Sequence, residues 1–127
     1  MGLFGKKAPA LTKARTLKRG SAVTVVDLEP GFVEWARSAK PAVDGKDHLV
    51  TVRVQLQGDD VILMAGGGGV VGRMAPKSAP NYRDEFAWMA QRGEYGVAEV
   101  AITAVGVKED HRLLINFDQY CRDGGIT

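Results

Sequence analysis

The sequence predicts an α+β protein that is mainly β: one small antiparallel β-barrel, or strongly bent sheet, of five or six strands, with one principal helix and a short N-terminal helix. The length of 127 residues and the apolar fraction of 45% suit a single core. Short Val-rich or alternating runs are joined by Gly-rich turns, and only residues 81–92 have a well-capped helical pattern. We expect residues 1–20 to form an arm, residues 21–118 the barrel domain and residues 119–127 a polar tail.

The first 20 residues are predicted to be a basic, flexible arm because they contain few large apolar groups. Their cations, with no acid among them, are Lys6, Lys7, Lys13, Arg15, Lys18 and Arg19. The rest of the chain carries 11 basic and 15 acidic residues. This asymmetry is typical of proteins that contact phosphates or an anionic surface, and a solvated tail explains it equally well. Helical spacing of Leu11, Ala14 and Leu17 would allow a short surface helix over residues 11–18.

The folded domain is expected to begin with a Val-rich strand over residues 22–28, which Glu29-Pro30-Gly31 ends. Apolar residues then recur with the spacing of one helix face, at Phe32, Trp35, Ala36 and Ala39. This predicts a short helix over residues 31–39 that ends before Pro41. Both aromatic rings, Phe32 and Trp35, are expected to pack on the core.

Strict alternation over residues 48–57 predicts a strand whose apolar face holds Val50, Val52, Val54 and Leu56. Gly58-Asp59-Asp60 is a turn, residues 61–65 form a second strand, and four glycines lead into a third strand over residues 70–74. The three strands would form a β-meander. The run Gly66 to Gly69 lacks the Lys-Ser/Thr ending of a nucleotide loop, so a hairpin connection is favoured.

The principal helix is predicted over residues 82–92, with Asn81 as its N-cap and Gly93 as its C-terminal stop. The helical period gives it a core face of Tyr82, Phe86, Met89 and Ala90. Trp88 falls off that face, which predicts an exposed recognition residue or, equally well, a ring covered by the N-terminal arm or the tail. Two more strands, at about residues 95–107 and 111–117, complete the sheet.

Residues that could support catalysis or bind a metal are scarce. His48, His111 and Cys121 do not have the spacing of a metal knuckle, and no serine lies in a strand–turn–helix elbow. We therefore expect a non-enzymatic protein with no metal and no cofactor. A single cysteine, no secretory signal and no apolar span favour the cytoplasm.

The order of features over residues 22–117 resembles a HIRAN domain, the small SH3-like or OB-like β-barrel found on DNA-repair helicases and as a stand-alone bacterial or phage protein. The similarity covers the Val-rich first strand, the Phe32–Trp35 segment, the meander, Val70-Val71-Gly72-Arg73-Met74, the helix closing in Gly93, and Val100-Ala101-Ile102. The family's Asn-x-Tyr-Asp turn and Asn-Ala-Val are replaced by Gln57-Gly58-Asp59-Asp60-Val61. Since those Asn and Tyr side chains help to grip a DNA end, the resemblance implies the fold more than DNA binding.

Three functions follow from these patterns. The leading one is binding of single-stranded or duplex-end DNA, by exposed aromatics and by phosphate contacts from the cations of the arm and from Arg73 and Lys77. The alternative is a phage or mobile-element interaction module that docks on a host protein through Trp88. The third is a peripheral membrane protein held by Leu3, Phe4 and the basic cluster.

Overall fold

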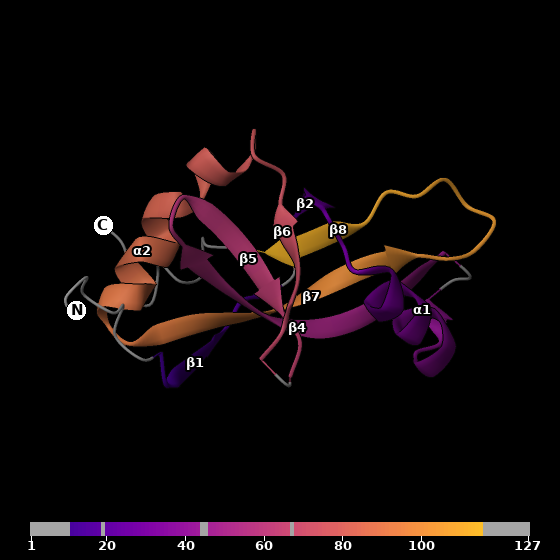
Figure 1. The fold of residues 1–127 in the computed structure, drawn as a ribbon, viewed down its shortest axis with the longest axis horizontal. Helices are drawn as coiled ribbons and strands as arrows, with labels where there is room; N and C mark the ends of the chain where they lie inside the picture. The colour runs from indigo at the N-terminus through magenta and orange to yellow at the C-terminus, as the bar shows by residue number, and fades with distance from the viewer. Residues whose placement is uncertain (1–10, 19, 44–45, 67, 116–127) are drawn as a thin grey trace.

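The computed structural model describes residues 11–18, 20–43, 46–66 and 68–115 (Figure 1). Its elements, in chain order, are β1 (Lys13–Thr16), β2 (Ser21–Val26), α1 (Pro30–Ala39), β3 (Ala42–Val43), β4 (Asp47–Gln57), β5 (Asp60–Met64), β6 (Val70–Met74), the 3-10 helix η1 (Ala79–Asn81), α2 (Arg83–Gln91), β7 (Glu94–Thr103) and β8 (Arg112–Ile115). In the part of the chain that is described, no helix is long and apolar enough to cross a membrane.

Six strands close into an antiparallel barrel, in the order β2, β6, β5, β4, β7, β8 and back to β2. The predicted fold class and the β4–β5–β6 meander are therefore confirmed. The long strand β7 closes the barrel, because it pairs with β4 along one edge and with β8 along the other. The two helices lie at opposite ends of the molecule (Figure 1).

Residues 13–16 form a strand, and the helix suggested for residues 11–18 is wrong. The strand β1 runs parallel to β7, with Lys13 opposite Glu94 and Thr16 opposite Val97. Leu17 follows it into the core and is only 5% exposed. A Cβ on Gly96 would lie 2.9 Å from Leu17 Cδ1, so the bare glycine backbone makes room for this leucine. The end of the predicted arm thus forms an additional strand beside β7 of the barrel.

The helix α1 begins at Pro30, whose fixed φ suits the first turn of a helix. It packs on the barrel through Val33 and Ala36, which are buried. Phe32 is partly buried against the core, as predicted, but Trp35 is 48% exposed, so its predicted core position is wrong. Because Val33 and Ala36 lie on the face of α1 that contacts the barrel, the Trp35 side chain lies away from the core.

The helix α2 closes the other end of the barrel with Phe86 and Met89, which are 1% and 0% exposed. Gly93, at φ 74°, stops it as predicted. Asn81 is not its N-cap: η1 ends at Asn81, and Tyr82 precedes the first turn without a side-chain cap. Phe86 and Met89 join Val50, Val52 and Val54 in one core, with Leu56 packed against it, which confirms the predicted core.

Candidate nucleic-acid interface

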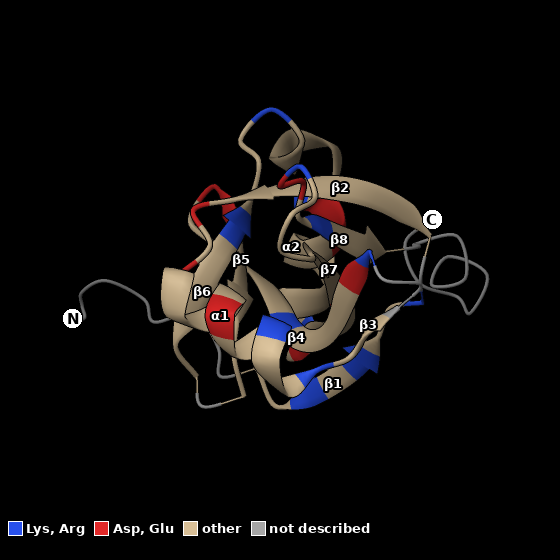
Figure 2. Cartoon of the chain, turned by 90° about the vertical axis from the view of Figure 1, so that its right-hand side faces the viewer, with Lys and Arg blue, Asp and Glu red and all other residues tan. Residues whose placement is uncertain are grey.

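The strand β1 carries cations of the predicted arm along the edge of the barrel. Lys13 and Arg15 are two residues apart, so they share one face of the strand, and Lys18 follows it as an exposed residue. Lys and Arg positions mark β1 in Figure 2. Within the described residues, no carboxylate forms an ion pair with Lys13 or Lys18.

Glu94 brings Arg15 and the end of α2 together. Its Oε2 lies 3.8 Å from Arg15 Nη2 and 3.9 Å from Arg92 Nε. One carboxylate thus lies between two guanidinium groups. Glu94 is the first residue of β7 and directly follows Gly93. The end of α2 at Gly93 and the pairing of β1 with β7 therefore position these three side chains.

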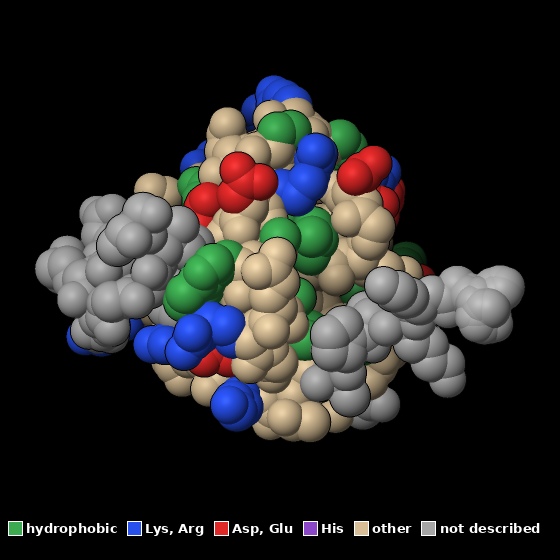
Figure 3. Space-filling model, turned by 90° about the vertical axis from the view of Figure 1, so that its left-hand side faces the viewer, with side chains coloured by type: hydrophobic (Ala, Val, Ile, Leu, Met, Phe, Trp, Pro, Cys, Tyr) green, Lys and Arg blue, Asp and Glu red, His purple; other side chains and the backbone are tan. Residues whose placement is uncertain are grey.

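Trp88 is next to this cluster but is not the exposed aromatic that the helix phase predicted. The ring is partly buried and packs against the core, and the Arg92 guanidinium carbon lies 4.8 Å from the ring centroid. Figure 3 shows the α2 end of the molecule, where Lys and Arg side chains adjoin hydrophobic ones. A base could therefore stack on Trp88 only after the Arg92 side chain moves.

Sequence reasoning missed Arg53, which anchors the segment before β1. Its guanidinium carbon lies 3.8 Å from the centroid of the Tyr95 ring, and its Nη2 donates to the Leu11 carbonyl at 3.2 Å. The side chain also donates from Nε to Gln55 Oε1 at 2.7 Å. The alternation of Arg53 and Gln55 with buried valines was the available signal, because it places both on the outer face of β4.

Arg73 and Lys77 do not join the β1 cluster. Arg73 lies on β6, three strands from β7 in either direction around the barrel. Its Nε donates to Asp27 Oδ2 at 2.6 Å and its Nη1 lies 3.5 Å from Asp60, so two carboxylates neutralise it. The hydrogen bond to Asp27 is the main cause of the raised pKa of Arg73. Lys77 is exposed after β6, whereas Lys6, Lys7 and Arg19 lie outside the described residues.

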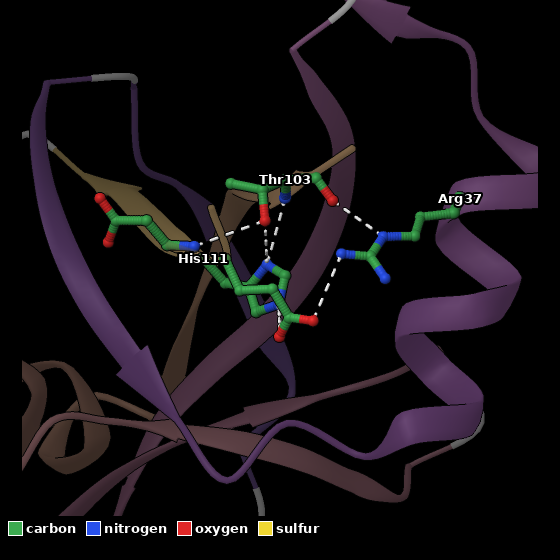
Figure 4. Close-up of polar contacts among 5 residues, drawn as sticks. Arg37, Thr103 and His111 are labelled. Carbon is green, nitrogen blue, oxygen red and sulfur yellow. Dashed lines mark hydrogen bonds and ion pairs between the residues drawn. The ribbon is translucent and has the colours of Figure 1, made fainter. Parts of the chain in front are cut away.

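Both histidines form hydrogen bonds with backbone groups of the fold. His48 Nδ1 donates to the Lys40 carbonyl at 2.5 Å, and His111 lies in a polar cluster between α1 and the β7–β8 loop (Figure 4). There Arg37 Nε donates to the Thr103 carbonyl at 2.8 Å, and Arg37 Nη2 lies 3.8 Å from Glu109. Across the described residues, no three His, Cys, Asp or Glu side chains lie close enough to hold a metal ion.

No model of a known protein family, no curated protein and no solved structure matches this chain. The resemblance to a HIRAN domain accordingly stays a prediction.

Proposed function

We propose that this protein is a non-enzymatic, HIRAN-like module that binds nucleic acid, in the form of single-stranded or duplex-end DNA. The observation that carries the proposal is the position of Lys13 and Lys18. Both are exposed cations with no carboxylate partner among the described residues. Lys13 lies opposite Glu94 of the Arg15–Glu94–Arg92 cluster in the β1–β7 register, and Lys18 follows the other end of β1. Exposed cations of this kind bind phosphates by releasing condensed counterions.

The surroundings of β1 support the same function. The Arg92 guanidinium lies over the Trp88 ring. A phosphate that draws Arg92 toward itself would uncover the Trp88 ring, and a base could then stack on it. The basic residues before β1 add charge to the same end of the chain, since Lys6 and Lys7 precede Lys13 without an intervening acid. Glu94 and Glu99 oppose the positive charge, which favours a salt-sensitive interaction of moderate affinity.

Docking on a host protein through Trp88 has less support, because the ring packs against the core and Arg92 covers one face of it. Membrane attachment through Leu3 and Phe4 concerns side chains outside the described residues. Nucleic-acid binding through β1 is the function that the described geometry supports best.

Equilibrium binding of fluorescently labelled DNA to matched lysine variants tests the proposal. The double variant Lys13→Ala/Lys18→Ala should bind single-stranded and blunt duplex DNA about tenfold more weakly, since each exposed charge contact contributes up to about 1 kcal/mol. The control Lys46→Ala/Lys108→Ala removes two exposed lysines elsewhere on the barrel and should bind like wild type. Equal losses in both variants would mean that only net charge matters, and would overturn the assignment to β1.

A further inference from the structure

The strand β4 has a gap in its pairing on one edge. Its whole N-terminal part pairs with β7, from Asp47 to Val54. On the opposite edge, β3 pairs with Asp47 and His48, and β5 pairs with Arg53 to Gln57. Among the described residues, no strand pairs with the four residues 49–52 on that edge. The barrel is therefore open there for one short stretch of backbone.

The backbone of Thr51 faces this gap. The Ala104 N–H donates to the Lys46 carbonyl at 2.8 Å, so the even-numbered residues of β4 direct their backbone groups toward β7. Because these directions alternate along an antiparallel strand, the N–H and C=O of Thr51 point to the opposite edge. An unpaired edge of this kind is a template for another extended chain.

An apolar groove of about 370 Å³ lies at the same place, between α1 and the β5–β6 hairpin. Its lining is Phe32, Trp35, Val50, Thr51, Ala65, Gly66 and Val71. The Phe32 and Trp35 rings form one wall, with centroids 6.0 Å apart. Gly66 keeps the other wall open, because a Cβ on this residue would have no atom within 4 Å. The volume is at the lower end of the ~300–1,000 Å³ range of ligand pockets.

The lining and the open strand edge of the groove favour a peptide ligand. None of the described residues that line it is charged, so this lining offers no cation to a phosphate backbone. An open strand edge beside an aromatic wall instead suits a peptide, whose backbone pairs with the edge while its side chains enter the pocket. The Lys40 Nζ lies 5.9 Å from the centroid of the Trp35 ring, which favours an acidic residue at that end of the peptide.

We propose that the groove between α1 and the β5–β6 hairpin binds a short extended peptide of a partner protein. The peptide exchanges backbone hydrogen bonds with Thr51 and inserts an apolar side chain between Trp35 and Ala65. Thr51 also lines a second pocket together with Thr16 and Lys18, so this peptide site adjoins the C-terminal end of β1.

The test is titration of the ¹⁵N-labelled full chain with capped pentapeptides, followed by NMR. The probes have the sequence Asp-Val-x-Val-Asp, where x is Leu, Ile, Val, Met, Phe or Trp. At least one of them should shift the Thr51 amide and the Trp35 indole signals. Methylation of the peptide nitrogen at x and its two neighbours should abolish the binding, because it removes the N–H donors that pair with β4.

Two variants and two controls locate the site. Trp35→Ala should weaken binding at least tenfold, and Gly66→Leu should do the same by filling the groove. The controls Val105→Ala and Gly69→Leu change an exposed valine and a glycine outside the groove lining and should bind like wild type. No shift with any pentapeptide at millimolar concentration, or equal binding of the N-methylated peptide, would overturn the proposal. Shifts at Thr51 and Trp35 with single-stranded DNA but with no peptide would reassign the groove to nucleic acid.

Discussion

The backbone N–H of Thr103 donates a hydrogen bond to Nδ1 of His111 at 3.1 Å. This bond fixes the imidazole as the neutral tautomer with its proton on Nε2, which lies 3.5 Å from Glu109 (Figure 4). Burial is the main cause of the lowered pKa of His111; Arg37 also lowers it, and Glu109 and Asp110 oppose the shift. The ring thus links β7 to the β7–β8 loop only while it is uncharged.

This arrangement predicts a loss of stability in mild acid. The pKa of His111 in the folded state is below its ordinary value of 6.5, so the unfolded chain takes up the proton first as the pH falls. The stabilisation should be complete above pH 6.5 and lost as the pH falls through the lowered pKa. Urea unfolding between pH 8 and 5 should show this loss in wild type. His111→Asn keeps an acceptor for Thr103 without titrating, and the same pH slope in that variant would refute the role of the histidine.

Phe86 should be among the most sensitive positions of the core. It is 1% exposed and packs between α2 and the barrel, so Phe86→Ala should cost about 3–5 kcal/mol of the free energy of unfolding. Trp35→Ala removes a larger but half-exposed ring and should cost less than about 1 kcal/mol. Urea denaturation measures both changes. Similar midpoints for wild type and the Phe86 variant would show that this ring is not in the core.

The contact between Leu17 and Gly96 should decide whether β1 stays on the barrel. Gly96→Ala puts a Cβ 2.9 Å from Leu17 Cδ1 and 3.2 Å from Phe86 Cε1, an overpacking that should cost about 1–3 kcal/mol. In a double-mutant cycle, Gly96→Ala should destabilise the Leu17→Ala variant less than it destabilises wild type, because the shorter side chain leaves space for the added Cβ. Strictly additive free energies would mean that the two residues do not touch. Deletion of residues 1–20 should destabilise the barrel for the same reason.

Trp88 and Arg92 should affect single strands more than duplex ends. If the ring stacks on a base once Arg92 moves, Trp88→Ala should weaken binding of single-stranded DNA by about 1–3 kcal/mol and leave duplex binding nearly unchanged. Because Trp88 also packs on the core, its variant needs a thermal melt to show that it remains folded. Trp88→Phe retains a ring and should recover part of the affinity. Equal losses for both DNA forms would contradict stacking.

Local pattern predicted those parts of the fold that depend on neighbours in sequence. Val50, Val52 and Val54 alternate with outward-facing residues because successive side chains of a strand point to opposite faces. Gly93 ends α2 because it adopts a left-handed backbone conformation that glycine accepts readily. The strand β1 could not be predicted in this way, because its partner β7 lies about 80 residues later in the chain. The exposure of Trp35 likewise depends on which stripe of α1 meets the barrel.

The candidate site was predictable only in part. Composition marked Lys13, Arg15 and Lys18 as a basic group, but it could not show that Arg15 meets Arg92 at Glu94. Arg73 looked equally suitable in sequence, and only the folded chain brings Asp27 and Asp60 to it. Ion pairs between distant segments determine which cations remain available to phosphate.

The salt dependence of DNA binding tests the role of β1 most directly. Affinity for a labelled single strand should be measured by fluorescence anisotropy from low to physiological salt, for wild type and for Lys13→Ala/Lys18→Ala. Each lost phosphate contact makes the slope of log affinity against log salt shallower by about 0.7 for a single strand, so the variant should differ by about 1.4. An unchanged slope, or no binding by wild type at micromolar concentration and low salt, would contradict a nucleic-acid interface at β1.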